Sequence, residues 1–331
     1  MTLVKQAKGT YAGECIPFGY AYDKDENQKR EYTGSGYHYL YDVERDNNPA
    51  KEFHLDWDVK DTWNVLPSDA NMHLSFTMLT DLDDVAMASG DPARNQPGNA
   101  DHFRYMLAHR KGENLCSSFV SVIEPYQGQK KIGSVKRLNV LPLSGDDNND
   151  VEMNVIALKV TLNDGRVDYI IHSTDSSTTY LIDNRFTYCG HFAFYSEKNG
   201  KLLYANLSDG ALFYESNVKL FDQMTSAITG VVKGFTKNLR DENQIMIETK
   251  KPLRECLKGR TIFVKTGKDK QTAYPIEESR NIDDATIVLD IGDITLIHQW
   301  QDINDLSKGY RYAISEGNEI RIPLTYSVER V

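Results

Sequence analysis

The chain has 331 residues, of which 40% are hydrophobic and 26% are charged, and its formal net charge is -10. This length suffices for two β domains or one large layered domain, and the composition excludes a disordered tail. A broad acidic surface repels phosphate backbones, so we expect no nucleic-acid partner.

Membrane insertion and metal or redox chemistry also lack signals in the sequence. No apolar run approaches the roughly 20 residues that span a bilayer, so we expect no membrane partner. The first residues, MTLVKQAKGTYAGE, lack the apolar core of a signal peptide. Cys15, Cys116, Cys189 and Cys256 form no CxxC pair, and we expect buried thiols rather than a zinc ribbon.

The secondary-structure signal is almost entirely of period two, which predicts strands. Gly36–Asp46 alternates and ends in a polar turn. Asn71–Leu79 places four apolar residues on one face, at alternate positions. Ser117–Tyr126 is rich in β-branched residues, and we expect that strand to stop at Pro125.

Four hairpins follow in the second half of the chain. Val155–Ser173 is a strand, an Asn-Asp-Gly turn and a second strand, because Gly165 can adopt the positive φ of a tight turn. Further hairpins are predicted to turn at Asn199-Gly200, near Gly267 and at Glu316-Gly317-Asn318. Many short strands separated by turns predict an all-β fold, a large antiparallel β-sandwich with a layered arrangement and only short helices. Ala100–Arg110 and Asn217–Ile228 are each expected to hold at most one short helix.

A polar run, Asp146–Asp150, marks a boundary between a central β-sandwich portion, residues 1–145, and a C-terminal one, residues 146–331. The same run could instead be a long hairpin loop within one continuous sandwich. Its clustered carboxylates could bind calcium, but the twelve-residue pattern with a central Gly and a terminal Glu is missing, so we favour a solvated loop.

One segment, Met87–Gly128 (MASGDPARNQPGNADHFRYMLAHRKGENLCSSFVSVIEPYQG), differs from generic β sequence. It resembles a hallmark stretch in the C-terminal half of bacterial heparinase II/III-type polysaccharide lyases. In that family a Pro-x-Arg/Gln-Asn-x-Pro-Gly-Asn turn precedes a Tyr-Leu-Ala-x-Arg-x-Gly strand and a Phe-Val-Ser/Thr-Val-x-Glu-Pro-Tyr strand. The matching residues are Asn95, Pro97, Gly98, Asn99, Tyr105, Arg110, Gly112, Phe119, Val120, Val122, Glu124, Pro125 and Tyr126.

The resemblance extends in order over nearly the whole chain from about Tyr37, through LKVTLNDGRVDYIIHS to the final strands. It implies a role in β-elimination of uronic-acid polysaccharides such as heparin, heparan sulfate or alginate. An acidic polysaccharide is then the expected partner. In such a reaction one group neutralises the uronate carboxylate, a base removes the C5 proton and an acid protonates the leaving oxygen.

The chain departs from the full family pattern in its missing parts. It has no helical α/α toroid and no Gly-His-x-His-like strand, and its eight histidines show no HxH or HExxH spacing. We therefore assign no catalytic residue and expect the isolated chain to be inactive or nearly so. No cofactor is expected here, because the family's zinc ligands would fall in the missing part. The resemblance implies an upstream α/α toroid of the same protein as a partner, and a periplasmic or secreted location for the full-length protein.

A cluster of cationic, aromatic and amide residues in the hallmark stretch is the candidate substrate-binding site. These side chains could form a loop that reaches the sugar cleft, with the two arginines meeting carboxylate or sulfate groups. We favour the alternative that they are structural, with a turn at Pro97-Gly98-Asn99 and Arg110 bonded to backbone carbonyls or Glu124. The candidates are Arg94, Asn95, His102, Tyr105, His109 and Arg110.

Two further features allow a functional interpretation. Glu124 could act as a general acid, but we favour a structural motif in which Pro125 ends the strand and Tyr126 plugs the sandwich edge. Trp57 and Trp63 could form a sugar-stacking platform, although the alternation of LDWDV favours a core position for Trp57. The competing functions are the accessory β half of a lyase, a stand-alone carbohydrate-binding module and a purely structural domain.

Overall fold

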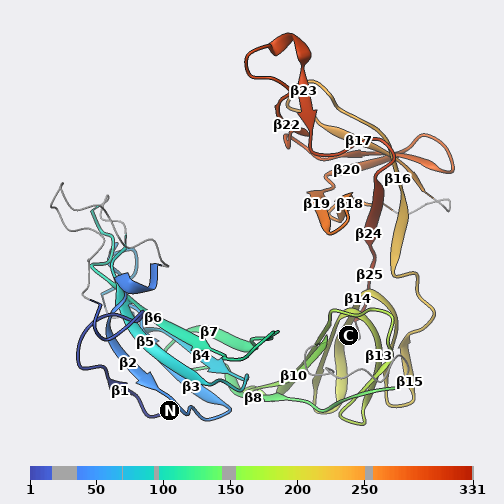
Figure 1. The fold of residues 1–331 in the computed structure, drawn as a ribbon. Coiled ribbons are helices and arrows are strands. Elements are labelled where there is room, and N and C mark those ends of the chain that lie inside the picture. The colour runs from blue at the N-terminus through green and yellow to red at the C-terminus, as the bar shows by residue number, and fades with distance from the viewer. Residues whose placement is uncertain (17–35, 69, 93–96, 144–153, 250–255, 330–331) are drawn as a thin grey trace. The chain divides into compact units, whose positions relative to one another are not determined.

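A computed structural model of the chain describes residues 1–16, 36–68, 70–92, 97–143, 154–249 and 256–329 (Figure 1). Strands account for 55% of the residues and helices for 3%, and the described part of the chain has no helix of seven or more residues. The predicted all-β, antiparallel class with only short helices is therefore confirmed. Within the same ranges, no helix is long and apolar enough to cross a bilayer.

The chain divides into two compact units. The first comprises Met1–Arg137 and the turn segment Val160–Gly165, and the second comprises Leu138–Lys159 and Arg166–Val331. Each unit has its own hydrophobic core, because the buried clusters contain residues of one unit only.

The first unit is built from two antiparallel sheets. They pack face to face, with Phe76 and Met78 of one sheet against Val85 of the other. One sheet has the order β1 (Val4–Lys5), β2 (Tyr41–Asp46), β5 (Asp84–Gly90), β6 (Phe103–His109), and the other has the order β3 (Phe53–Asp58), β4 (Met72–Met78), β7 (Ser121–Gln127). The 3₁₀ helix η2 (Gly36–Tyr39) precedes β2, and β8 (Ile132–Arg137) follows β7.

The first sheet of the second unit surrounds an aromatic core. Phe186, Tyr188 and Phe213 are fully buried at its centre. Its strands run in the order β15 (Val218–Phe221), β14 (Lys201–Glu215), β13 (Phe186–Lys198), β11 (Arg166–Ser173), β10 (Val155–Leu162), joined by β12 (Tyr180–Ile182), β9 (Val140–Pro142) and β25 (Thr325–Glu329).

The second sheet of this unit buries an aliphatic core rich in Ile and Leu. Its order is β19 (Lys270–Pro275), β18 (Thr261–Gly267), β24 (Glu319–Pro323), β16 (Ala227–Phe235), β17 (Gln244–Thr249), β21 (Thr286–Asp290), β20 (Glu278–Asn281). A separate pair, β22 (Ile297–Trp300) and β23 (Tyr310–Tyr312), extends beyond this sheet with the short helix η3 (Leu306–Lys308) (Figure 1).

Three predicted hairpins are confirmed. Gly165 lies between β10 and β11 with φ 86°, and Asn199 and Gly200 join β13 to β14 with φ 54° and 71°. β18 and β19 pair across a turn after Gly267. The hairpin predicted at Glu316-Gly317-Asn318 is wrong, although Gly317 does adopt a positive φ. The flanking strands separate, because β23 pairs with β22 while β24 pairs with β16 and β18.

Ala100–Arg110 contains β6, and Asn217–Ile228 contains β15 and the start of β16, so the single short helix allowed for in each segment does not form, because pairing with neighbouring strands overrides a weak helix signal. One local prediction is wrong. Pro125 does not end its strand, since β7 continues to Gln127. β7 is the edge of its three-stranded sheet, where a missing N–H breaks no ladder.

The cysteines also differ from expectation. Only Cys189 is buried, while Cys15, Cys116 and Cys256 are exposed, and all four are free thiols. Burial raises the pKa of the Cys189 thiol, as expected for a thiol with a hydrophobic packing role. The three exposed thiols lie outside the hydrophobic clusters, so the residue type alone did not determine burial.

Gly230 is required by the close approach of β16 and β17. A Cβ at this position would lie 2.0 Å from the carbonyl oxygen of Glu248. We expect Gly230→Ala to destabilise the second unit by about 1–3 kcal/mol, because backbone must move to relieve the overlap. Thermal unfolding followed by circular dichroism measures this. Gly267→Ala is the control, since its Cβ meets only Lys270 side-chain atoms at 3.6 Å or more. Equal melting temperatures for both variants would contradict the packing argument.

Candidate functional site

The outward face of the β3–β4–β7 sheet carries a concentrated polar cluster. Alternation along β3 turns Phe53, Leu55 and Trp57 toward the hydrophobic core and leaves His54 and Asp56 on the opposite face. The strand register places polar neighbours from β4 and β7 on the same face. The paired sets are Asp56, Ser75 and Glu124, and Asp58, His73 and Tyr126.

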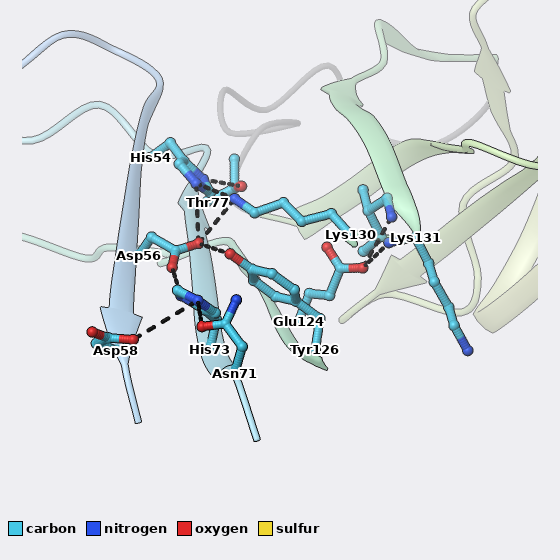
Figure 2. Close-up of polar contacts among 11 residues, drawn as sticks. His54, Asp56, Asp58, Asn71, His73, Thr77, Glu124, Tyr126, Lys130 and Lys131 are labelled. Atoms are coloured by element: carbon cyan, nitrogen blue, oxygen red, sulfur yellow. Dashed lines mark hydrogen bonds and ion pairs between the residues drawn. The ribbon is translucent and has the colours of Figure 1, made fainter. Parts of the chain in front are cut away.

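The carboxylate of Asp56 is the centre of this cluster. It accepts hydrogen bonds from His73 Nδ1 at 2.8 Å and from the Tyr126 hydroxyl at 2.9 Å, and forms an ion pair with Lys130 Nζ at 3.0 Å. Figure 2 shows these three side chains converging on Asp56 from β4, β7 and the segment after β7. We call Asp56, His73, Tyr126 and Lys130 the Asp56 clamp, because they join all three strands.

The clamp holds Asp56 ionised. Partial burial favours a raised pKa, but hydrogen bonds from Lys130, Tyr126 and His73 outweigh it and lower the pKa of Asp56 to about 2. The pKa of Tyr126 is raised, by partial burial and by its hydrogen bond to the Asp56 carboxylate. The pKa of His54 is lowered, first by burial and then by the nearby Lys130 charge. Lys130 Nζ donates to His54 Nε2 at 2.7 Å.

Tyr126 and Glu124 of the hallmark stretch are both engaged in holding the sheet. The Tyr126 ring stacks on His73 at 4.9 Å and also lies 5.3 Å from Lys130 Nζ, so it is not a bare platform for a sugar. It points to the polar face and does not plug the sandwich edge. Glu124 Oε1 accepts from the backbone N–H groups of Lys131 at 2.6 Å and Ile132 at 3.0 Å (Figure 2). These bonds favour the structural interpretation of Glu124 over a general acid.

The residues proposed for substrate binding do not meet in one place as far as the structure describes them. Arg94 and Asn95 lie outside the described residues. His102 is exposed in the segment before β6, and Tyr105 lies on β6 with 41% of its surface exposed. His109, the last residue of that strand, is roughly 20 Å from His102 along the chain direction.

The basic stretch His109–Lys111 is neutralised by two aspartates. His109 Nδ1 lies 3.0 Å from Asp84 Oδ2, Lys111 Nζ lies 2.8 Å from the same oxygen, and Arg110 Nε lies 3.7 Å from Asp83. Arg110 therefore pairs with Asp83 rather than with Glu124. Because these cations already have carboxylate partners, this stretch does not offset the acidic charge of the chain.

The two tryptophans have different environments. Trp57 is half-buried and packs edge-on against Phe76 at 6.2 Å, consistent with the expected core position. Trp63 is 59% exposed and its ring borders Gly98. They do not form a shared platform, because one side chain faces the core and the other solvent.

Metal binding finds no support among the described residues, which contain no group of three His, Cys, Asp or Glu side chains suited to a metal ion. The acidic run Asp146–Asp150 lies outside the described residues.

The sequence contained one signal for the Asp56 clamp. Alternation in FHLDWD and MHLSFTM places His54, Asp56 and His73 at positions opposite in phase to the apolar residues. It could not show that β3 pairs with β4 and that β4 pairs with β7, so Lys130 and Tyr126 could not be joined to them. The clamp was therefore missed.

In comparisons with protein-family models, curated proteins and solved structures, no match to this chain was found. The resemblance to heparinase II/III-type lyases therefore stays a prediction from the sequence motifs of Met87–Gly128 and the flanking strands.

Asp56→Asn should weaken the fold at neutral pH and flatten its acid sensitivity. Because the folded-state pKa is about 2 and the ordinary value is 3.8, the ionised clamp stabilises the protein above about pH 4. This contribution is lost as the pH falls toward 2. Since the site is partly exposed, we expect about 1 kcal/mol, measured as the loss of unfolding free energy at pH 7.

Asp58→Asn is the matched control. Asp58 lies on the same face of β3, its side chain is 91% exposed, and its nearest charged contact is His73 at 3.8 Å. The control should leave unchanged both the unfolding free energy at pH 7 and its decrease between pH 4 and pH 2. If the Asp56→Asn variant lost as much unfolding free energy between pH 4 and pH 2 as the parent protein, the clamp would not hold Asp56 ionised.

Proposed function

We propose that this chain is the C-terminal, all-β portion of a bacterial heparinase II/III-like polysaccharide lyase. In this role it lines or supports the substrate cleft while β-elimination is carried out by an α/α toroid of the same protein. The substrate class is an acidic, uronate-containing polysaccharide, and the location is periplasmic or secreted.

The observation that carries the proposal is the use made of the hallmark residues. The stretch Met87–Gly128 supplies β6 to one sheet of the first unit and β7 to the other. Three polar side chains of the stretch have partners within the unit: Glu124 accepts from backbone N–H groups, Tyr126 donates to Asp56 and His109 bonds to Asp84. A motif used in this way builds a scaffold, and the chemistry is left to other residues.

The acid–base properties of Asp56, Tyr126 and His54 also support the assignment of the lyase chemistry to residues outside this chain. A base that abstracts the C5 proton works best with a pKa near the operating pH. Asp56 has a pKa of about 2, and the pKa of Tyr126 is raised above its ordinary value of 10.0, so both lie far from neutrality. His54 Nε2 is occupied by Lys130. None of these groups is a free base with a suitable pKa.

β6 carries an exposed aromatic surface that a docking domain could bury. Phe103 and Tyr105 are 47% and 41% exposed, and their rings contact each other edge-on at 6.3 Å. Tyr105 lies beside Leu40, since a Cβ on Gly90 would touch both side chains. Exposed aromatic groups of this kind mark contact surfaces, and the proposal assigns this one to the toroid.

A stand-alone carbohydrate-binding module is the second candidate, and one observation favours it. Trp300 and Tyr310 lie opposite each other across the β22–β23 pair with tilted rings whose centroids are 4.4 Å apart, and Trp300 is 38% exposed. An aromatic pair on a projecting hairpin is suited to a sugar ring. This candidate requires that Trp300→Ala abolishes glycan binding by the chain, whereas the lyase proposal assigns no role to Trp300.

The lyase proposal is tested by assaying the chain with heparin, heparan sulfate and alginate. Formation of the unsaturated uronate product is followed by its ultraviolet absorbance. We expect no product above the enzyme-free rate, because the proton-abstracting groups belong to the toroid. Product formed by the chain alone, and lost in a Tyr126→Phe variant, would overturn the claim that proton abstraction requires the toroid.

The reading frame upstream of Met1 provides the decisive companion test. We expect it to encode a helical domain bearing Tyr and His residues, and the joined protein to form product from at least one of the three polysaccharides. An upstream frame without such a domain, or a joined protein inactive on all three, would contradict the proposal.

A further inference from the structure

The second unit contains a groove whose chemistry differs from that of the acidic chain around it. A cavity of about 760 Å³ lies on the outward face of the seven-stranded sheet, across β16, β24, β18 and β19. Figure 1 shows the β18–β19 hairpin beside β24 in this part of the unit. Its volume falls in the range typical of ligand sites.

The groove arises from the alternation of these strands. Ile262, Val264 and Ile320 turn into the aliphatic core, so Phe263 and Arg321, which are paired in register, face outward. Val231 pairs with Glu319 on the next strand and adds an apolar side chain. The result is a floor with apolar groups in place of the fully polar face usual on the solvent side of a sheet.

Cations outnumber anions among the lining residues. Four lining residues are cationic and two are anionic, whereas the whole chain has a net charge of -10. Two of the cations are already paired, because Lys265 Nζ lies 3.2 Å from Glu319 and Arg321 forms a bidentate pair with Asp209. The lining charges are Lys265, Lys268, Lys270 and Arg321 against Asp269 and Glu319.

Lys268 and Lys270 carry the available positive charge. Among the residues described by the structure, neither has an acidic partner within 4.0 Å. Two other lysines of this unit are paired, Lys233 of β16 with Glu248 at 2.7 Å and Lys258, in the turn before β18, with Glu278. The free pair lies at the β18–β19 turn, where Asp269 between them lowers the local excess of charge without removing it.

We propose that this groove binds a segment of an acidic polysaccharide. Lys268 and Lys270 meet carboxylate or sulfate groups, and Phe263 and Val231 contact the apolar face of a sugar ring. The choice of ligand rests on the proposed function, while the groove itself rests on its shape and charge. Lys265 and Arg321, on β18 and β24, are held by ion pairs to Glu319 and Asp209.

The test measures binding of heparin and alginate oligosaccharides to the full chain by calorimetry at low salt. The double variant Lys268→Ala/Lys270→Ala should bind about five- to tenfold more weakly, since two exposed ionic contacts are lost. Gln271→Glu, which adds a negative charge without removing a contact, should also weaken binding. Binding by the parent protein should fall as NaCl is raised, because the contacts are exposed.

Lys233→Ala/Lys258→Ala is the matched control, because it removes the same charge from the same unit outside the groove lining. It should retain parental affinity. The proposal that the groove binds an acidic polysaccharide would be overturned by any of three results. These are equal weakening of both double variants, no binding by the parent protein, and equal affinity for neutral dextran. Tighter binding of single-stranded DNA than of the oligosaccharides would overturn the ligand class.

These outcomes separate the groove from the lyase proposal. Lysine-dependent binding by a chain whose upstream reading frame lacks a helical domain would refute the lyase proposal and keep the groove. The joined protein could instead carry Lys268→Ala/Lys270→Ala without any change in product formation or in oligosaccharide affinity. This result would refute binding at the groove and leave the lyase proposal standing.

Discussion

The sheets of this protein bury one face in a hydrophobic core and leave the other in contact with water, and successive side chains alternate between the two environments. In the first unit this constraint puts Leu55 and Trp57 against the core, and Asp56 on the outer face of the same strand. In the second unit it buries Ile262 and Val264 and turns Phe263 and Lys265 outward. The clamp and the groove are both products of this two-sided arrangement.

Charge pairing then distinguishes the two outer faces. At the Asp56 clamp every cation has an acidic partner or a hydrogen-bond acceptor, and the cluster as a whole joins three strands. The same is true of His109 and Lys111, which share the Asp84 carboxylate. In the groove, Lys268 and Lys270 are left for an external anion. A satisfied polar cluster adds to stability, whereas a cationic lining left without internal partners is available for binding.

This contrast makes the proposed acidic ligand compatible with an acidic chain. A net charge of -10 opposes approach of a polyanion on average, and salt limits that repulsion to about 8–10 Å. A local cationic groove can therefore act within a generally acidic surface. In the two proposals, the scaffold role belongs to the sheets of the first unit and the ligand contact to the outer face of the second unit.

How much could be predicted depended on the range of the interaction. The all-β class and the turns at Gly165 and Asn199-Gly200 followed from period-two alternation and from residues that tolerate positive φ, which are local properties. The continuation of β7 through Pro125 did not follow, because it depends on β7 being an edge strand. The strand identity of Ala100–Arg110 also required a partner, which β5 supplies.

By itself, the sequence determined which residues alternate and where the chain can turn tightly. The tertiary structure decided the strand partners, and with them the hydrogen-bond and ion-pair partners of the Asp56 carboxylate and the residues that border the groove. The reason is that these contacts join positions far apart in the chain, such as Asp56 and Tyr126 or Val231 and Phe263. Sheet register brings such positions together, and alternation within a single strand carries no information about the register.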